Sequence, residues 1–222
     1  MEPSFWHERW AQGQIGFHLA APHPLLIKHA TGLGERSRVL VPLCGKATDL
    51  VWLAERGHGV LGVELSELAV RAFFEEQKLS ARESVCGPFK QFVAGPIEIL
   101  CGDFFALETA HLVDEHGRTV TALYDRAALV ALPELMRKRY ANHVMGLLPA
   151  TARGLLITLE YGTSTSSGPP FSVTAEEVHA LYEPRLEVRE LERSDILDSE
   201  PRFRDRGITA LYETAYALRT SP

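Results

Sequence analysis

Residues 38–64, RVLVPLCGKATDLVWLAERGHGVLGVE, combine local patterns that together decide the fold. The β-branched apolar run at residues 39–41 is typical of a strand buried on both faces. After a break at PLCGK, apolar residues recur at helical spacing as far as Gly57, where a helix C-cap is expected. Residues 60–63 return to a strand pattern, which ends at the acid Glu64. The order strand, loop, helix, strand and acid predicts the first half of a nucleotide-binding βαβ unit.

The loop and the acid indicate what this unit would bind. A loop between a strand and a helix directs backbone N–H groups and a positive dipole end at its ligand. Glu64 follows Gly45 at about the 20-residue spacing expected for an acid that accepts ribose hydroxyls. The G-x-G-x-x-G fingerprint is absent, however, and no Ser or Thr follows Lys46, so the loop is not a P-loop. An ordinary βαβ unit without a ligand therefore stays an open alternative.

Composition limits the class of protein. A chain of 222 residues with 45% hydrophobic and 23% charged residues is most simply one soluble α/β domain. The net charge of −6 argues against a general nucleic-acid binder, which needs a basic face. No apolar run approaches the ~18 residues of a membrane span, and the N-terminus lacks the pattern of a secretory signal.

The cysteines predict a reducing compartment, and the histidines predict that the protein has no metal site. Three cysteines form no C-x-x-C pair, which predicts free thiols in a cytoplasmic protein. Nine histidines are scattered without ligand spacing, so we predict no metal site. We expect a monomer that binds a small molecule and neither nucleic acid nor membrane.

Residues 1–30 do not follow the βαβ pattern. Trp6 and Trp10 lie at i, i+4 on one helical face, and Phe17 follows after a Gly-rich turn. One interpretation is an aromatic arm that packs on the core. The other is a lid whose rings close over a planar or cationic ligand, and the concentration of tryptophan here slightly favours it. We therefore divide a single domain, residues 1–222, into a lid arm, 1–30, and a Rossmann-like core, 38–218.

Chemically useful residues follow two further predicted strands. Asp103 and Phe104 come directly after the strand expected at residues 97–101, where an adenine could be bound and covered. Arg126 follows the strand expected at residues 120–124. The alternatives are a turn aspartate with a core phenylalanine, and an ion pair between Arg126 and its neighbour or another carboxylate.

The remaining pattern completes an α/β layout. A fifth strand is expected at residues 155–159, and two alternating segments, 186–192 and 208–218, are expected to form an antiparallel edge pair. Residues 80–96 are irregular, with a short hairpin around Phe89 and Phe92 as one interpretation. Five strands that alternate with helices and a closing pair predict a mostly parallel, seven-stranded sheet with helices on both faces.

This layout is that of the class I S-adenosylmethionine-dependent methyltransferases, and local motifs narrow the resemblance. FWHERW, IGFH, VLVPLCGK, LGVELS, CGDFF, LYDRAAL and GPPFSV closely resemble motifs of the thiopurine S-methyltransferase family, especially its bacterial members. They run from residue 5 to residue 173, almost the whole domain. The resemblance also explains the missing glycine fingerprint, because this family has PLCGK in its place.

The resemblance implies roles for individual residues. The residues expected to bind S-adenosylmethionine are Trp10, Leu43, Gly45, Glu64, Asp103, Phe104 and Arg126. Arg126 is also the residue expected to act in catalysis, near both cofactor and acceptor, and Phe17 is expected to cover the acceptor. Residues of the variable segment GTSTSSG receive no role.

The resemblance further implies transfer of a methyl group to aromatic or heterocyclic thiols such as thiopurines, with selenium or tellurium compounds as further acceptors. An ionised thiol needs alignment more than a general base, and alignment can supply ~7–11 kcal/mol. Cys44 lies beside the cofactor loop, but no histidine relay accompanies it, so we interpret it as a packing residue. Two alternatives remain: an NAD-dependent Rossmann dehydrogenase, and a protein that binds S-adenosylmethionine without catalysis.

Overall fold

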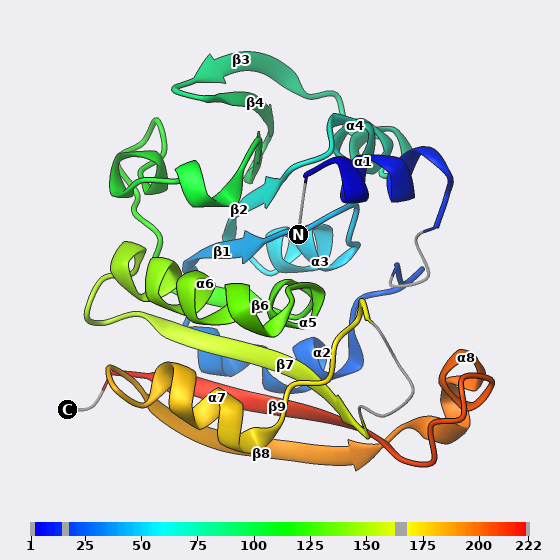
Figure 1. The fold of residues 1–222 in the computed structure, drawn as a ribbon. Coiled ribbons are helices and arrows are strands. Elements are labelled where there is room, and N and C mark those ends of the chain that lie inside the picture. Colours follow the sequence, from blue (N-terminus) through cyan, green and yellow to red (C-terminus); the bar gives the residue numbers. More distant parts are fainter. Residues whose placement is uncertain (1–2, 15–17, 163–167, 221–222) are drawn as a thin grey trace.

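The computed structural model describes residues 3–14, 18–162 and 168–220. Within them, the strands form one sheet in the order β3-β4-β5-β2-β1-β6-β7-β9-β8 (Figure 1). The strands are β1 (Arg38–Pro42), β2 (Gly59–Glu64), β3 (Arg82–Cys86), β4 (Phe89–Ala94), β5 (Ile97–Cys101), β6 (Ala122–Asp125), β7 (Arg153–Tyr161), β8 (Glu187–Asp195) and β9 (Leu211–Arg219). The five central strands, β5 to β7 in this order, are parallel, and β9 and β8 close one edge as the expected antiparallel pair.

The prediction of seven strands is wrong, because the sheet formed by the described residues has nine. The irregular region at residues 80–96 is a hairpin, β3 and β4, whose inner strand pairs antiparallel with the free edge of β5. Phe89 and Phe92 are both buried, but they belong to clusters on opposite faces of the sheet. Anchored on both faces, the hairpin extends the sheet beyond the seven strands that the pattern indicated.

Helices cover both faces of the sheet, as predicted (Figure 1). The α-helices are α1 (Pro3–Ala11), α2 (Pro24–His29), α3 (Asp49–Glu55), α4 (Glu67–Glu76), α5 (Ala128–Ala131), α6 (Glu134–Leu147), α7 (Ala175–Tyr182) and α8 (Pro201–Arg204). Short 3-10 turns are η1 (Ala30–Leu33), η2 (Phe104–Ala106), η3 (Thr109–Leu112) and η4 (Leu197–Ser199). None of the helices in these described ranges is long and apolar enough to cross a membrane.

Alternating strand residues divide the core into two layers. In β1, Leu40 packs with α6 and α7 on one face, whereas Val39 and Val41 pack with α2, α3 and α4 on the other. Leu26 in α2 is fully buried in the second layer, so the chain has joined the core by this point, within the predicted arm. The prediction of a moving lid is therefore narrowed to the residues before α2.

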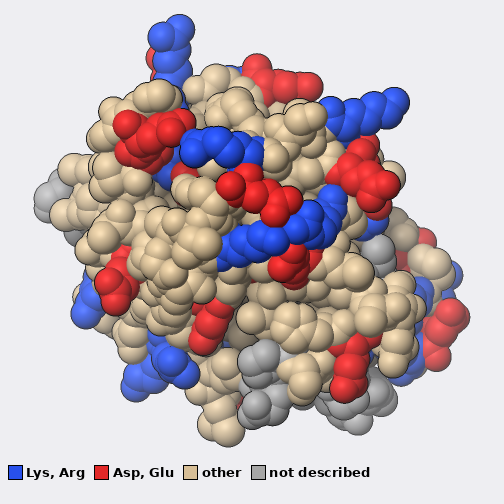
Figure 2. Space-filling model, turned by 90° about the horizontal axis from the view of Figure 1, so that it is seen from above, with Lys and Arg blue, Asp and Glu red and all other residues tan. Residues whose placement is uncertain are grey.

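Charged side chains hold the hairpin to the body of the protein. The Arg71 guanidinium in α4 pairs with Glu67 and Glu83, and the Lys90 ammonium in β4 pairs with the same two carboxylates. Seen from above, acidic and basic side chains are interspersed on this face and do not gather by sign (Figure 2). Charges along an outer strand also discourage pairing with another sheet edge.

Candidate active site

A cavity of about 800 Å³ opens where the parallel strands end. Its lining includes residues at or near the carboxyl ends of the five central strands: Leu43, Gly45, Glu64, Gly102, Asp103, Arg126 and Leu159. The connections after β1 and β6 diverge here, which is where open α/β sheets bind ligands. The volume lies within the range of small-molecule sites.

Glu64 organises the loop after β1. Its Oε2 accepts a hydrogen bond from the Gly45 N–H at 2.9 Å, and its Oε1 accepts one from the Ser66 N–H at 2.8 Å. Leu43 and Gly45 both have positive φ, +48° and +55°, so the loop curls back towards β2. Burial raises the pKa of Glu64, and the backbone hydrogen bonds partly oppose this increase. The loop and the acid, which the sequence analysis expected to bind one ligand, are therefore also in direct contact with each other.

Cys44 has no role in the cavity chemistry that the structure supports. Its thiol is buried, and burial together with the charge of Glu64 raises its pKa well above the ordinary value. A Cβ added at Gly62 would lie 2.8 Å from the Cys44 sulfur, so the two residues fill one tight contact. This arrangement supports the interpretation of Cys44 as a packing residue, because a protonated buried thiol is a poor nucleophile.

Asp103 and Phe104 form the wall beyond Glu64. The Asp103 carboxylate accepts the Phe105 N–H at 2.9 Å and begins the turn η2. The Phe104 ring is buried, 5.4 Å between centroids from Tyr140, and His143 Nε2 lies 3.2 Å from the Phe104 carbonyl oxygen. The wall is thus a fixed aromatic surface with one exposed carboxylate at its edge.

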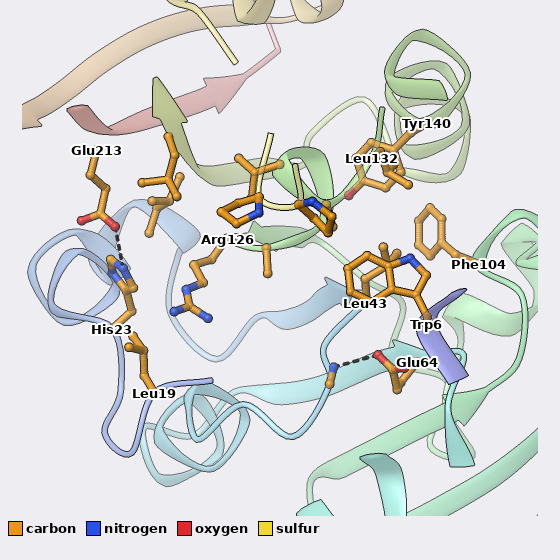
Figure 3. A pocket seen from close by; sticks show the side chains of 18 of the residues that line it. Trp6, Leu19, His23, Leu43, Glu64, Phe104, Arg126, Leu132, Tyr140 and Glu213 are labelled. Carbon is orange, nitrogen blue, oxygen red and sulfur yellow. Dashed lines mark hydrogen bonds and ion pairs between the residues drawn. The ribbon is translucent and has the colours of Figure 1, made fainter. Parts of the chain in front are cut away.

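Arg126 enters the cavity from the end of β6 (Figure 3). Its neighbour Asp125 is fully buried and accepts hydrogen bonds from the Ala128 N–H, the Leu129 N–H and the Tyr140 hydroxyl. No carboxylate among the described residues lies within salt-bridge distance of the Arg126 guanidinium. The alternative of an ion pair with Asp125 is therefore wrong, and the cation faces the cavity.

Asp125 predicts a pH-dependent stability. Burial raises its pKa to about 6 from 3.8, so between these values the folded protein binds more protons than the unfolded chain. The free energy of unfolding should therefore fall as pH rises through this window, by on the order of 3 kcal/mol from this group. Asp125→Asn cannot ionise, so its melting temperature relative to wild type should rise between pH 5 and pH 7.5. If the melting temperatures of the two proteins change by the same amount across this pH range, the assignment to Asp125 is contradicted.

The aromatic arm lies over the Glu64 end of the cavity. Trp6 and Trp10 of α1 both line it, and Trp10 is only 6% exposed. The Phe5 ring meets Trp6 edge-on, with 5.3 Å between centroids, and the Arg9 guanidinium lies over Phe5. These contacts fit a packed arm and a cover over a ligand equally, so movement of the lid stays a prediction.

The opposite end of the cavity carries a His–Glu pair in which His23 is buried and Glu213 is partly buried. His23, which precedes α2, and Glu213, in β9, approach to 3.0 Å between Nε2 and Oε1. In Figure 3 they lie at the end that Arg126 enters, with Glu64 and Phe104 at the other. The cavity therefore has an acidic, aromatic end and a second end with both signs of charge.

The structure brings almost all the predicted site residues together. Those that line the cavity are Trp10, Leu43, Gly45, Glu64, Asp103, Phe104 and Arg126. Phe17 lies outside the described residues. The sequence analysis gave Trp6 a role only in the lid interpretation and assigned no site role to Tyr140, His23 or Glu213. Trp6 and Tyr140 had a helical-face signal, but His23 and Glu213 are 190 positions apart and had none.

No group of three or more potential ligands capable of holding a metal ion occurs among the residues described.

The parallel sheet, the acid that ends β2 and the cavity at the carboxyl ends of the strands match the class of S-adenosylmethionine-dependent methyltransferases, and solved structures share the fold. One is the 1,6-didemethyltoxoflavin-N1-methyltransferase of Burkholderia thailandensis, with a TM-score of 0.64, 17% identity and coverage of 99% of this chain and 87% of that one. Another is an S-adenosylmethionine-dependent methyltransferase from Anabaena variabilis, with a TM-score of 0.65, 13% identity and coverage of 99% and 95%.

Sequence comparison specifies the family. The family model for thiopurine S-methyltransferase matches residues 1–221. The thiopurine S-methyltransferase of Xanthomonas axonopodis pv. citri is 54% identical over 99% of both chains, and that of Pseudomonas fluorescens strain Pf0-1 is 49% identical over 99% of both. The chain belongs to the thiopurine S-methyltransferase family. It is an S-adenosylmethionine-dependent methyltransferase, which confirms the resemblance and disfavours the dehydrogenase alternative.

Proposed function

We propose that this enzyme transfers the methyl group of S-adenosylmethionine to the sulfur of aromatic or heterocyclic thiols such as thiopurines. One observation carries the proposal: a single cavity joins the Glu64 end to an Arg126 guanidinium without a carboxylate partner among the described residues. The names of the relatives support the choice of acceptor. Selenium and tellurium compounds are proposed as further acceptors, because they too present an ionised nucleophile, and selenium and tellurium belong to the same group of the periodic table as sulfur.

The Glu64 end fits the cofactor. S-adenosylmethionine supplies a methyl group already activated by its sulfonium charge. Each Glu64 oxygen has accepted one backbone N–H and retains a lone pair for a ribose hydroxyl. We propose that Asp103 and Phe104 bind and cover the adenine, whereas Leu43 and Gly45 face the methionine end and Trp10 closes the top.

Arg126 fits a role at the reacting sulfur. A cation that faces a mostly apolar cavity attracts an anionic ligand more strongly than it would in water. We propose that its guanidinium holds the acceptor thiolate in line with the methyl group, so that orientation supplies most of the rate enhancement. Phe17 is proposed to cover the acceptor on the strength of the family resemblance alone.

Methyl transfer to a panel of thiols tests the proposal. With labelled S-adenosylmethionine, aromatic and heterocyclic thiols should become methylated, with selenite and tellurite as further arms. S-adenosylhomocysteine should raise the melting temperature and NAD should not, since a ligand at 100 times its Kd stabilises by about 2.7 kcal/mol. Stabilisation without transfer to any acceptor would favour the alternative of binding without catalysis.

A further inference from the structure

The His23–Glu213 pair forms a built polar site at the end of the cavity remote from Glu64. The His23 side chain is 5% exposed and the Glu213 side chain 19% exposed, and both residues line the cavity. The two come from opposite ends of the chain, and Figure 3 shows them facing each other close to Arg126. The proposed roles of Glu64 and Arg126 leave this pair without a function.

Hydrogen bonds fix the form of the imidazole. His23 Nδ1 accepts the Leu25 N–H at 3.2 Å, where it caps the first turn of α2. A neutral imidazole that accepts at Nδ1 carries its proton at Nε2, so Nε2 donates to Glu213 Oε1. His23 therefore has no lone pair left with which to take a proton from a ligand. The base of the pair is Glu213.

A second set of bonds keeps His23 in place. The His23 N–H donates to Asp49 Oδ1 at 2.7 Å, and the Tyr124 hydroxyl donates to Asp49 Oδ2 at 3.0 Å. Asp49 is itself buried at the start of α3. Anchored through α2, α3 and β6, the imidazole presents Glu213 to the cavity in one orientation.

Glu213 retains the capacity to accept a hydrogen bond. In the part of the chain that the structure describes, His23 is its one hydrogen-bond partner, and the contact uses Oε1. The charges of Arg126 and Glu213 both affect the pKa of the Tyr124 phenol, which is raised mainly by burial and by Asp49. Arg126 lowers that pKa and Glu213 raises it. An anionic acceptor and a cationic donor thus stand at the same end of the cavity.

A heterocyclic thione matches this pair of charges. In such molecules the proton lies on a ring nitrogen beside the carbon that bears the sulfur. The sulfur suits the Arg126 guanidinium and the ring N–H suits a carboxylate. Building on the proposed function, we propose that Glu213, positioned by His23, takes the ring N–H proton of thione acceptors as their sulfur is methylated.

The step balances in atoms and charge. The acceptor sulfur forms a bond to the methyl carbon while the bond from that carbon to the sulfonium sulfur breaks and leaves its electron pair on that sulfur. The C=S bond becomes single, and the N–H electron pair forms the C=N bond. The proton passes to Glu213, whose carboxylate becomes a carboxylic acid and later releases it to water. The sulfonium loses its positive charge as Glu213 loses its negative one.

Two acceptors of nearly equal shape distinguish a role of Glu213 in proton transfer from a general loss of activity in the variant. Pyridine-2-thione carries a ring N–H, whereas thiophenol ionises to a thiolate and has none. We expect Glu213→Gln to lower the ratio of kcat/KM for pyridine-2-thione over thiophenol by roughly 10- to 100-fold. This is at or below the lower end of a positioned base's contribution, because water can take the proton in the variant.

A matched control exists in a second His–Glu pair. His29 Nε2 lies 3.0 Å from Glu192 Oε2, and neither residue lines the cavity. Glu192→Gln should therefore keep the wild-type ratio between the two acceptors. Equal losses on both acceptors in Glu213→Gln would overturn the proposal and leave Glu213 a structural residue.

Two substitutions of His23 test its positioning role. His23→Asn keeps a side-chain acceptor for the cap of α2 but loses the donor to Glu213, whereas His23→Gln can place an amide N–H near the Nε2 position. The Gln variant should stay closer to the wild-type ratio than the Asn variant. The reverse order, with both variants folded by melting temperature, would contradict positioning by His23.

Binding gives a readout that does not depend on turnover. With the enzyme saturated by S-adenosylhomocysteine, Glu213→Gln should weaken pyridine-2-thione about tenfold by calorimetry, as expected for loss of a charge-assisted hydrogen bond. The same substitution should weaken the binding of thiophenol less. Unchanged affinity for pyridine-2-thione would overturn the contact. If the wild type methylates neither thiol nor any other thiol tested, the proposed function fails; methylation of thiophenol alone refutes only the role of Glu213.

Discussion

Replacing Glu64 with alanine should weaken S-adenosylmethionine binding about 100-fold, since a hydrogen bond to a charged group contributes ~1.5–3 kcal/mol and ~1.4 kcal/mol is a tenfold change. The variant loses the proposed ribose acceptors, and it also releases the loop after β1. Without the carboxylate, the Gly45 and Ser66 N–H groups lose the partners that hold them. The effect therefore combines a lost ligand contact with a loss of preorganisation.

Calorimetric affinities for S-adenosylmethionine in wild type, Glu64→Gln and Glu64→Ala test this. The Gln variant retains one carbonyl oxygen as an acceptor, so its affinity should fall between the other two. Glu76→Ala is a suitable control, because Glu76 pairs with Lys46 of the same loop but does not line the cavity. A folded Glu64→Ala protein with wild-type affinity would refute the assignment of Glu64 to the cofactor.

Replacing Arg126 with alanine should reduce turnover on an aromatic thiol by roughly 100- to 1000-fold, the range seen when one preorganised donor to a reacting anion is removed. The structure strengthens this expectation, because the guanidinium has no carboxylate partner among the described residues and its removal breaks no salt bridge there. Arg126→Lys keeps the charge but loses the planar fork, so it should also be impaired, though less.

Turnover measured beside cofactor affinity separates catalysis from binding. Arg126→Ala should lower kcat by a larger factor than it lowers the affinity for S-adenosylmethionine. Glu64→Ala should lower the affinity by the larger factor. Melting temperatures of both variants establish that they are folded. Intact turnover in folded Arg126→Ala would assign the arginine a structural role and remove it from the reaction.

The sequence by itself determined the features that depend on neighbours along the chain. The run from residue 38 to residue 64 predicted β1, α3, β2 and the acid at the end of β2, because strand and helix periods are local properties. The carboxyl ends of parallel strands meet at one edge of a sheet. Asp103 and Arg126 could therefore be placed at the same edge of the sheet as Glu64, and the family resemblance supplied their roles.

Only the tertiary structure decided how distant segments pair. The hairpin of β3 and β4 has a weak pattern, and its place in the sheet follows from the free edge of β5 and the burial of Phe89 and Phe92 on opposite faces. Whether Arg126 has an ion-pair partner depends on where the bonds of Asp125 go, and they go to α5 and Tyr140.

The His23–Glu213 pair is the clearest case. It joins the segment before α2 to β9, across 190 positions, and neither residue lies in a motif that the sequence analysis used for the site. Hydrophobic period and turn chemistry report the burial and direction of a residue within its own element. Contact between two side chains requires the register of both elements in the sheet. That register is fixed when β9 pairs with β7 and α2 packs into the core beside them.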